Sequence, residues 1–485
     1  MKFRRTTLIT AGCASALAGL GLARLFQFPG RLWPIILFSC VLVLLKPKKG
    51  TAFIAVIALG LSLGLWRGGQ YMNHQHDLQR LTTRTVTIQA TATSDSIYAT
   101  KSQIQFTAGN VKLLEPYKKP LAGSFKLSGF GEKMIYRGDT VIVAGKLYPS
   151  RGSNQATIAY AKLTKTAEGY SWLNNLGRRF AAGMQNALPE PVASFAMGLL
   201  VGQRSTMPQD VITMLTMVGL VHIVAVSGYN VTILARAVAR LKLPSKYQQL
   251  VLSLALIIGF VLITGFSASI VRAALVSILT LWAWFYGRQI KPLVLISFAA
   301  ALTGMFNPFY VWGDLGWYLS FLAFFGVLVI APIITVRLFA NPPKLLTMVL
   351  IETLSAEIMT LPLIMMTFSQ LSLIALIANV LVVPLVPLAM LLSAVAGLAG
   401  MLAAPIAGWF ASPARLLLTY MLDLVHLLSN IPSEFLHLSI SPVVMVMTYS
   451  FVLLIIAAAH RHISRKNAII TDKNKLKLEV QNVRS

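Results

Sequence analysis

Apolar segments long enough to cross a lipid bilayer recur along most of the chain, and they constrain its fold more than any other feature. Hydrophobic residues make up 56% of the 485 residues and charged residues only 12%, a composition outside the range of soluble globular domains. Stretches of about 20 apolar residues are typical of transmembrane helices. The sequence therefore predicts a polytopic α-helical membrane protein.

One long stretch, residues 68–172, does not follow this pattern. It contains short alternating runs such as "RTVTIQATA" and "DTVIVAGKL", separated by Gly, Asp, Asn and Pro, which indicate about five strands. Strands of this number and length suit a small β-barrel, for which an OB-like fold is one candidate. We expect four regions: N-terminal transmembrane helices over 1–67, an inserted β-rich domain over 68–172, a polytopic membrane domain over 173–460, and a basic tail over 461–485.

The distribution of positive charge orients these regions. The formal net charge is +27, with 42 Lys and Arg against 15 Asp and Glu. Such a balance suits anionic lipid headgroups, an anionic substrate, or both. Basic residues cluster in short loops at the N-terminus, at 46–49, 236–246, 288–291 and 337–344, and in the tail. By the positive-inside rule, these loops and both termini are cytoplasmic, and residues 68–172 are external.

The β-rich region carries 13 Lys and Arg against 6 Asp and Glu, and aromatic side chains lie among its cations. Single-stranded nucleic acids bind to such surfaces because rings stack on bases while cations follow the phosphates. An alternative is that the aromatics belong to the domain core and the cations are merely solvated. The candidate nucleic-acid contacts are Phe130, Lys133, Tyr136, Arg137 and Lys146.

Several polar residues fall inside or beside predicted spans, where a charge costs roughly 2.5–3.5 kcal/mol at mid-helix. Arg272, Glu352, Glu357 and Asp314 are the charged examples. We expect them to face a bundle interior, a partner or water, and Arg272 paired with either glutamate is the structural alternative. Polar and helix-weakening residues also mark an interior pathway. The resulting candidates for channel-lining or hinge positions are His222, Ser227, Gly228, Asn230, Ser267, Arg272, Glu357 and Asn379.

Two catalytic interpretations are weaker. The Ser-Gly pair in "AVSG" is similar to that of an intramembrane serine protease, but nothing in the sequence fixes a base beside the serine. The "NHQHDL" stretch at 73–78 resembles the start of a metal-binding run without its final histidine. With only two cysteines there is no thiolate cluster. We expect no enzyme activity, no metal and no cofactor.

Five polar blocks, taken in order, resemble the ComEC family of bacterial competence proteins. They are "GLLVGQRSTMP" at 198–208, "GLVHIVAVSGYNV" at 219–231, "TGFSASIVRAAL" at 264–275, "DLGWYLSFLA" at 314–323 and the long block at 356–387. Many members carry a metallo-β-lactamase-like domain after the membrane region. Here a short basic tail follows instead, so we expect a form without that domain. Gln203, Tyr229, Asn230 and Glu357 also depart from the residues common in the family.

The resemblance implies an inner-membrane channel for uptake of single-stranded DNA during natural transformation. It also implies partners: single-stranded DNA, an external DNA receptor, a cytoplasmic helicase or single-strand-binding protein, and a separate nuclease. The sequence contains no P-loop, so the driving force is expected to come from another protein or gradient. A transporter or flippase for another anionic or lipidic substrate is the alternative, because basic surfaces and intramembrane charges would serve it equally well.

Overall fold

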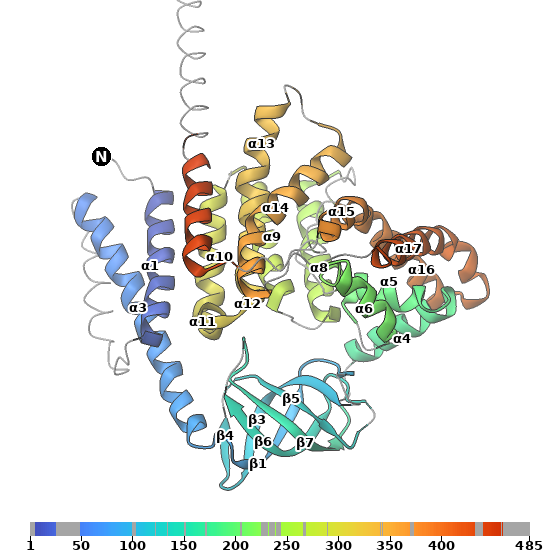
Figure 1. Cartoon of the computed structure of the whole chain (residues 1–485), viewed down its shortest axis with the longest axis horizontal. Helices are drawn as coiled ribbons and strands as arrows, with labels where there is room; N and C mark the ends of the chain where they lie inside the picture. The colour runs from blue at the N-terminus through green and yellow to red at the C-terminus, as the bar shows by residue number, and fades with distance from the viewer. Residues whose placement is uncertain are drawn as a thin grey trace, which may run out of the picture. The chain divides into compact units, whose positions relative to one another are not determined.

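The fold of the chain is given by a computed structural model (Figure 1). It describes residues 5–25, 49–98, 103–121, 123–132, 134–149, 152–169, 172–203, 206–224, 231, 238, 244–264, 268–288, 290–339, 341, 343–368, 373–431, 440–456 and 458. The described chain is mostly helical, with one β-sheet. Its contacts divide it into two compact units, one comprising residues 1–321 and 381–432 and the other comprising 322–380 and 433–485.

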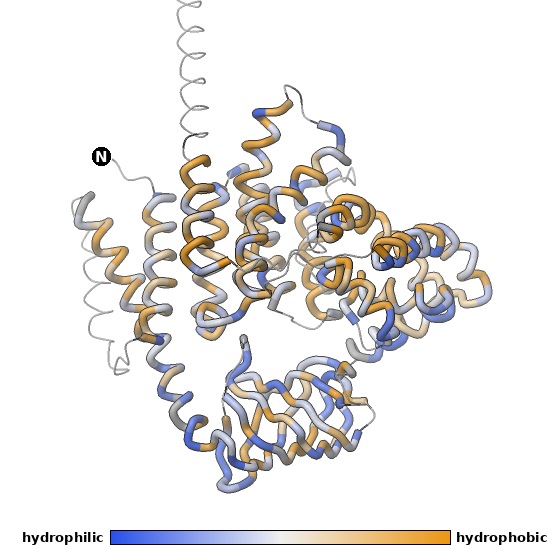
Figure 2. The backbone as a smooth tube through the Cα atoms, in the orientation of Figure 1, coloured by the Kyte–Doolittle hydropathy of each residue, from blue (hydrophilic) through white to orange (hydrophobic). Residues whose placement is uncertain are grey.

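Among the described residues, five helices are long and apolar enough to cross a membrane, and Figure 2 shows the apolar residues concentrated on helices. These spans are Arg5–Leu25, Thr51–Asn73, Leu315–Leu338, Thr347–Phe368 and Ile377–Leu402. Shorter apolar helices accompany them, including Pro442–Ile456. A multi-pass membrane protein with an inserted β-domain, as the sequence predicts, is thus confirmed in outline.

The larger unit contains most of the helices. They are α1 (Arg5–Leu25), α3 (Lys49–Gln79), α4 (Trp172–Ala187), α5 (Val192–Val201), α6 (Gln209–Met217), α8 (Lys246–Thr264), α9 (Ala268–Phe285), α10 (Pro292–Phe306), α11 (Phe309–Gly313), α16 (Val386–Leu402) and α17 (Ala407–Ser429). Short 3₁₀ turns, η3 (Val383–Leu385) and η4 (Ala404–Ile406), precede α16 and α17. Within the region 1–67, where the sequence predicts N-terminal transmembrane helices, residues 26–48 lie outside the described residues.

Glycines allow α1 and α3 to pack with their backbones in contact. A Cβ added at Gly64 would lie 2.1 Å from the carbonyl oxygen of Ala16, and one at Gly19 would lie 2.3 Å from that of Leu61. Small residues permit this close approach in membranes, where dispersion rather than water exclusion holds helices together. Helices α1 and α3 therefore form a tightly packed pair.

The smaller unit is built on an irregular helix. Helix α12 (Leu315–Phe325) runs into the π-helix η2 (Gly326–Ile330) and then α13 (Ala331–Leu338). Helix α14 (Leu345–Phe368) contains Pro362, and α15 (Leu373–Val382) follows. Gly326 of η2 meets α14 so closely that a Cβ there would lie 2.3 Å from the Ser355 carbonyl oxygen. The segment from Leu373 to Leu402 forms α15, η3 and α16 in succession, with Pro384 and Pro387 at the junction.

The sheet region begins at Thr85, because α3 continues to Gln79, beyond the boundary expected at residue 67. Its described strands are β1 (Thr85–Ala92), β2 (Ile97–Tyr98), β3 (Ile104–Glu115), β4 (Lys119–Leu121), β5 (Phe125–Phe130), β6 (Thr140–Pro149) and β7 (Ala156–Ala167). Hydrogen bonding follows the order β1-β6-β7-β5-β3, and β1 also pairs with β3. The pairing of these five strands therefore returns to its starting strand. Only β5 and β7 pair in parallel.

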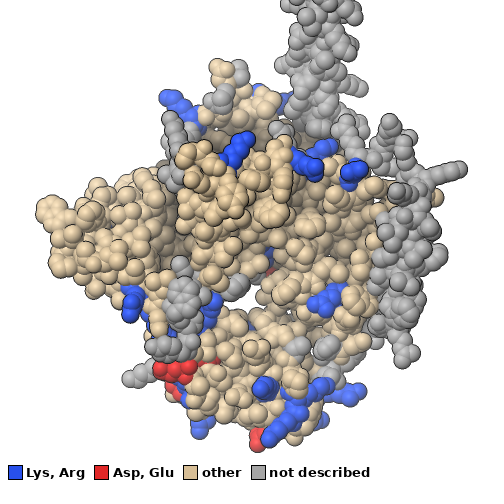
Figure 3. All heavy atoms as spheres, turned by 180° about the vertical axis from the view of Figure 1, so that it is seen from behind, with Lys and Arg blue, Asp and Glu red and all other residues tan. Residues whose placement is uncertain are grey.

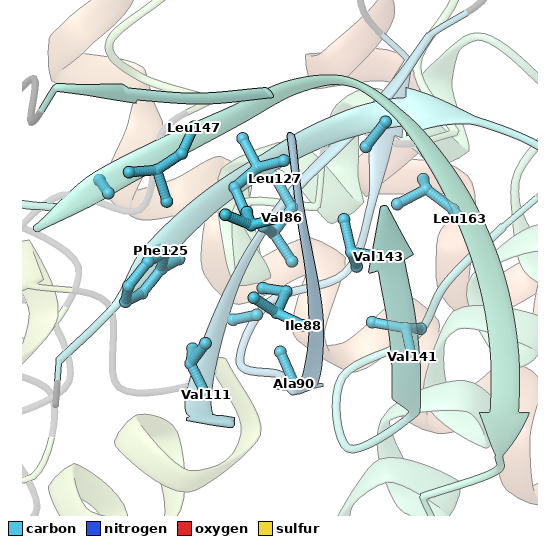
Figure 4. Close-up of a cluster of buried hydrophobic side chains, with 14 of the residues drawn as sticks. Val86, Ile88, Ala90, Val111, Phe125, Leu127, Val141, Val143, Leu147 and Leu163 are labelled. Atoms are coloured by element: carbon cyan, nitrogen blue, oxygen red, sulfur yellow. The ribbon is translucent and has the colours of Figure 1, made fainter. Parts of the chain in front are cut away.

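Alternating side chains of this sheet form an apolar core (Figure 4). Phe125 and Leu127 of β5 are fully buried, as are Ile88, Val141 and Val143 on neighbouring strands. The burial pattern of β6 alternates residue by residue from Thr140 to Leu147. The period-two pattern in the sequence correctly located these strands, because one face of each must be removed from water.

Candidate functional site

Arg272 lies in the second turn of α9 and is only 2% exposed. Its Nη2 donates a hydrogen bond of 3.0 Å to the carbonyl oxygen of Gly316 in α12. Its Nε and Nη1 are buried and have no hydrogen-bond partner. A buried donor without a partner costs about 1–3 kcal/mol, and more when the group is charged. Two N–H groups of one guanidinium, on different edges of its plane, are thus left able to donate charge-assisted hydrogen bonds to oxyanions.

Helix ends around Arg272 are fixed by aromatic and carboxylate groups. Asp314 precedes α12, and its Oδ1 accepts a hydrogen bond of 3.1 Å from the Trp317 amide. The Trp317 indole donates to Thr303 Oγ1 at 3.0 Å, and that of Trp312 to the Leu20 carbonyl at 2.8 Å. The two tryptophans on either side of Asp314 therefore tie α11 to α1 and α12 to α10.

A second buried polar centre lies in the smaller unit. Asn379 of α15 is 7% exposed, and its Nδ2 donates a hydrogen bond to Glu357 Oε1 on α14. Glu357 Oε2 and Asn379 Oδ1 are both buried without a partner. Nearby, Ser355 is fully buried and donates to the Ile351 carbonyl at 2.6 Å. The structure thus pairs two of the residues that the sequence proposed only as separate candidates.

The stretch that contains His222 is described only in part. The His222 side chain is exposed, and its Nδ1 lies 3.0 Å from the carbonyl oxygen of Gly219, whose φ of 73° needs a glycine. The other candidates of this stretch, Ser227, Gly228 and Asn230, lie outside the described residues, as does Ser267. His222 therefore marks a turn after α6.

The candidates in the β-rich region separate into two groups. Phe130, at the end of β5, is 45% exposed, and Lys146 of β6 is exposed. Arg178 of α4 lies over the Tyr136 ring at 4.4 Å, and Arg137 Nη1 donates to the Leu262 carbonyl of α8 at 3.2 Å. Tyr136 and Arg137 therefore join the sheet to helices, whereas Phe130 and Lys146 face outward. Lys133 lies outside the described residues.

Two further outward residues escaped the sequence analysis. Tyr160 of β7 is 73% exposed, and Lys162 is also exposed. Strand register places Lys162 opposite Phe130 of β5, and Ala159, next to Tyr160, opposite Lys146 of β6. We call Phe130, Lys146, Tyr160 and Lys162 the outer sheet face. The signal in the sequence was the alternation within "ATIAYAKL", but the pairing of β5 with β7 is needed to bring the four residues together.

The loop after β5 is held by a buried carboxylate. Asp139 is fully buried and accepts hydrogen bonds from the Gly169 amide at 2.9 Å and the Tyr136 amide at 3.0 Å. Its Oδ2 also lies 3.0 Å from Lys165 Nζ. Burial acts to raise the Asp139 pKa, but these hydrogen bonds and the lysine charge outweigh it, so the pKa is lowered. Asp139 thereby fixes the loop that carries Tyr136 and Arg137.

The sheet meets the helices at two described points besides the Tyr136 and Arg137 contacts. Gln75 of α3 donates to the Gln155 carbonyl at 3.1 Å, and Asn307, just after α10, donates to the Ser153 carbonyl at 3.1 Å. On the face drawn in Figure 3, Lys and Arg predominate over Asp and Glu. In the part of the chain that the structure describes, no three His, Cys, Asp or Glu residues are grouped so that they could hold a metal ion.

Long apolar helices, an inserted basic sheet and buried polar groups between helices define a polytopic membrane protein with an appended β-domain. The model of the family described as "Competence protein" matches residues 199–462, more than half of the chain, and the protein belongs to this family. The chain is also similar to ComE operon protein 3 of Bacillus subtilis (strain 168), with 26% identity over 204 residues. That alignment covers 41% of this chain and only 25% of the Bacillus protein. No solved structure matches the chain.

Proposed function

We propose that this protein conveys single-stranded DNA across the bacterial inner membrane during natural transformation. Membership of the competence family supports this role. A strand with a charge on every phosphate cannot enter hydrocarbon, so it needs a hydrated path on which cations or dipoles offset that charge. The proposed role is passage alone, with no covalent step.

The observation that carries the proposal is the Arg272 guanidinium. It is buried inside the helical part, yet two of its nitrogens have no hydrogen-bond partner among the described residues. A group of this kind is retained in a membrane segment when it serves a substrate path or a partner. Nε and Nη1 can each donate a hydrogen bond to a phosphate oxygen. We therefore assign Arg272 as a phosphate contact on the path.

The β-rich region is the proposed receiving surface. Its strands pair in the circuit β1-β3-β5-β7-β6-β1, with β5 and β7 parallel, which we interpret as a closed OB-like barrel. The outer sheet face supplies two exposed rings and two exposed lysines. Rings stack on any base and lysines follow the backbone, so such a face would bind a strand with little sequence preference.

The contacts of the sheet support an external location. Helices α8 and α10 begin close to basic loops that the charge rule assigns to the cytoplasm, at Lys246 and Lys291. The sheet touches each of them at or just beyond the opposite end, through Leu262 and Asn307. We therefore propose an external β-domain that passes the strand to the outer ends of the helices. An external DNA receptor, a cytoplasmic helicase or single-strand-binding protein, and a separate nuclease are the partners this arrangement would need.

The test replaces Arg272 in a transformable host that lacks its own copy of the gene. R272Q keeps a donor for the Gly316 carbonyl but removes the charge, and R272K keeps the charge but loses the planar fork. The matched control is R288Q, because Arg288 is an exposed arginine just after the other end of α9. A hydrogen bond to a charged group contributes about 1.5–3 kcal/mol, so R272Q should lower uptake of labelled DNA by roughly 10- to 100-fold.

Transformation frequency, labelled DNA in the cytosol and the amount of protein in the membrane are measured together. Normal uptake in R272Q at normal protein level would show that Arg272 does not contact the strand. If R272Q fails to accumulate, R272K decides, and full uptake in that variant would contradict a two-bond contact. Normal transformation after deletion of the whole gene would instead favour the alternative, a transporter or flippase for a different anion.

A further inference from the structure

The contact between Glu357 and Asn379 is incomplete in a specific way. The amide donates one hydrogen bond to Glu357 Oε1. The two atoms left over, Glu357 Oε2 and Asn379 Oδ1, are both acceptors when the carboxylate is ionised, and both are buried without a partner. Each of these acceptors then carries the cost of its lost hydration without a donor to offset it.

One proton removes both defects. A protonated carboxyl has an O–H donor, and a carboxamide has a carbonyl acceptor next to its N–H₂ group. An acid and an amide can therefore form a ring with two hydrogen bonds, one from N–H to the acid carbonyl and one from O–H to the amide carbonyl. The structure already contains the first bond, and the two orphaned atoms are the ends of the second. We propose that Glu357 and Asn379 form a proton-binding site that fastens α14 to α15.

A proton fits the site better than a metal ion. Glu357 and Asn379 offer three side-chain oxygens in all, whereas Ca²⁺ takes six to eight oxygens and Mg²⁺ requires about six in octahedral geometry. Among the described residues, no cluster of three or more His, Cys, Asp or Glu supplies further ligands. A single proton on Glu357 Oε2 can be donated in a hydrogen bond to Asn379 Oδ1. Both atoms then have a hydrogen-bond partner, and no additional group is required.

Few other titratable groups lie around the pair. On α14 itself, Glu352 is five residues earlier and thus on a different side of the helix. η2 and α15 carry no titratable side chain, and α13 carries Arg337, which is exposed in its last turn. The helix Pro442–Ile456 contributes Tyr449, whose hydroxyl donates to the Met359 carbonyl at 2.9 Å. No cation from these elements pairs with the Glu357 carboxylate, so a proton is the available means of neutralising it.

Both α14 and α15 have positions at which they can bend when the contact between Glu357 and Asn379 is broken. Pro362 follows Glu357 by five residues and removes one amide hydrogen bond from α14. Asn379 lies four residues before the 3₁₀ turn η3, which contains Pro384. On the other side of α14, η2 is a π-helix, a form that is frequent at functional sites. Loss of the proton would leave a buried negative charge facing the Asn379 carbonyl, and separation of α14 from α15 would relieve it.

The test is infrared spectroscopy of the purified full-length protein in detergent. A protonated carboxyl has a carbonyl stretch that ionised carboxylates and amides lack. We expect a protonated-carboxyl band in the wild-type minus E357Q difference spectrum at neutral pH, and none in the wild-type minus E168Q spectrum, because Glu168 is exposed. N379L should shift the band to the position of an acid without a partner. That shift separates the proposed ring from a glutamic acid that is merely buried.

Thermal unfolding provides a second readout. E357Q keeps both hydrogen bonds without a titratable group, so its melting temperature should stay level from neutral to alkaline pH while that of the wild type falls. Absence of the band from the wild type at neutral pH would overturn the proposal. A band that sodium removes at constant pH would also overturn it, in favour of a metal cation. Neither measurement uses DNA, so the outcome is independent of the proposed uptake role.

Discussion

Lys165 makes two ion pairs of equal length that should differ greatly in their contribution to stability. Its Nζ lies 3.0 Å from Asp139, which is fully buried, and 3.0 Å from Glu168, whose side chain is 79% exposed. Removing one partner of a buried, hydrogen-bonded pair costs about 3–5 kcal/mol. An exposed pair contributes only about 0.2–1 kcal/mol. A comparison of D139N with E168Q therefore tests the effect of burial on an ion pair at the same distance between nitrogen and oxygen.

The structure explains the large value for D139N. The carboxylate accepts from the Gly169 and Tyr136 amides on separate oxygens. An asparagine has one acceptor, so its N–H₂ group would face a second N–H or the lysine ammonium. The change of about 3–5 kcal/mol is a large part of the 5–15 kcal/mol that usually stabilises a domain.

Peptide-resolved hydrogen exchange of residues 125–169 in the full-length protein provides the assay, because exchange from the sheet reports its opening free energy. At 1.4 kcal/mol per tenfold, D139N should speed exchange about 10²- to 10³-fold and E168Q less than about fivefold. Equal effects of the two substitutions would refute the argument from burial.

The sign of the pH dependence of stability follows from the lowered Asp139 pKa. The stabilisation is complete above the pKa of an unfolded aspartate and is lost as pH falls through the lowered value. D139N should remove that acid sensitivity.

Two further predictions concern packing and binding. G64A should destabilise the full-length protein by about 1–3 kcal/mol in thermal unfolding, because the new Cβ would meet the α1 backbone. The control G21A should not destabilise it, because there is open space around that Cβ. Unchanged stability of G64A would contradict the close packing of α1 and α3. F130A and Y160A should each weaken binding of a single-stranded oligonucleotide by roughly 5- to 100-fold in fluorescence anisotropy. Y117A, at an exposed tyrosine outside the outer sheet face, should have no effect. Equal losses in all three variants would argue against a defined face.

The sequence predicted those features that depend on the pattern of neighbouring residues along the chain. Apolar length located the spans, and two-residue alternation located strands such as β6. The end of α3 was misplaced by about 12 residues, because its last turns are polar and resemble a loop, although Gln75 there bonds to the sheet. A helix that leaves the membrane and continues as a support for a domain has no apolar signal over its final part.

The candidate site shows why partners are harder to predict than residues. Arg272, Glu357 and Asn379 were recognisable as polar groups in apolar segments. Which side chains meet depends on helix rotation and depth, so neither the Asn379–Glu357 contact nor the bond from Arg272 to Gly316 could be predicted. Tyr136 and Arg137 illustrate the reverse case. They looked like ligand contacts because an aromatic and a cation at a surface loop have the same composition whether they bind a strand or a neighbouring helix.

Two independent features of the chain support the proposed orientation. The charge rule predicts that the starts of α3, α8 and α10 lie on one side of the membrane, because basic residues occur at 46–49, 236–246 and 288–291. Hydrogen bonds place the sheet at the other end of the same helices, through Gln75, Leu262 and Asn307. The charge rule does not depend on the hydrogen bonds, and the hydrogen bonds do not depend on the count of charges, so the two kinds of evidence are independent. Because Arg272 lies in the second turn of α9, which begins just after the Leu262 end of α8, the proposed path would bring a strand from an external sheet to this guanidinium early in its passage.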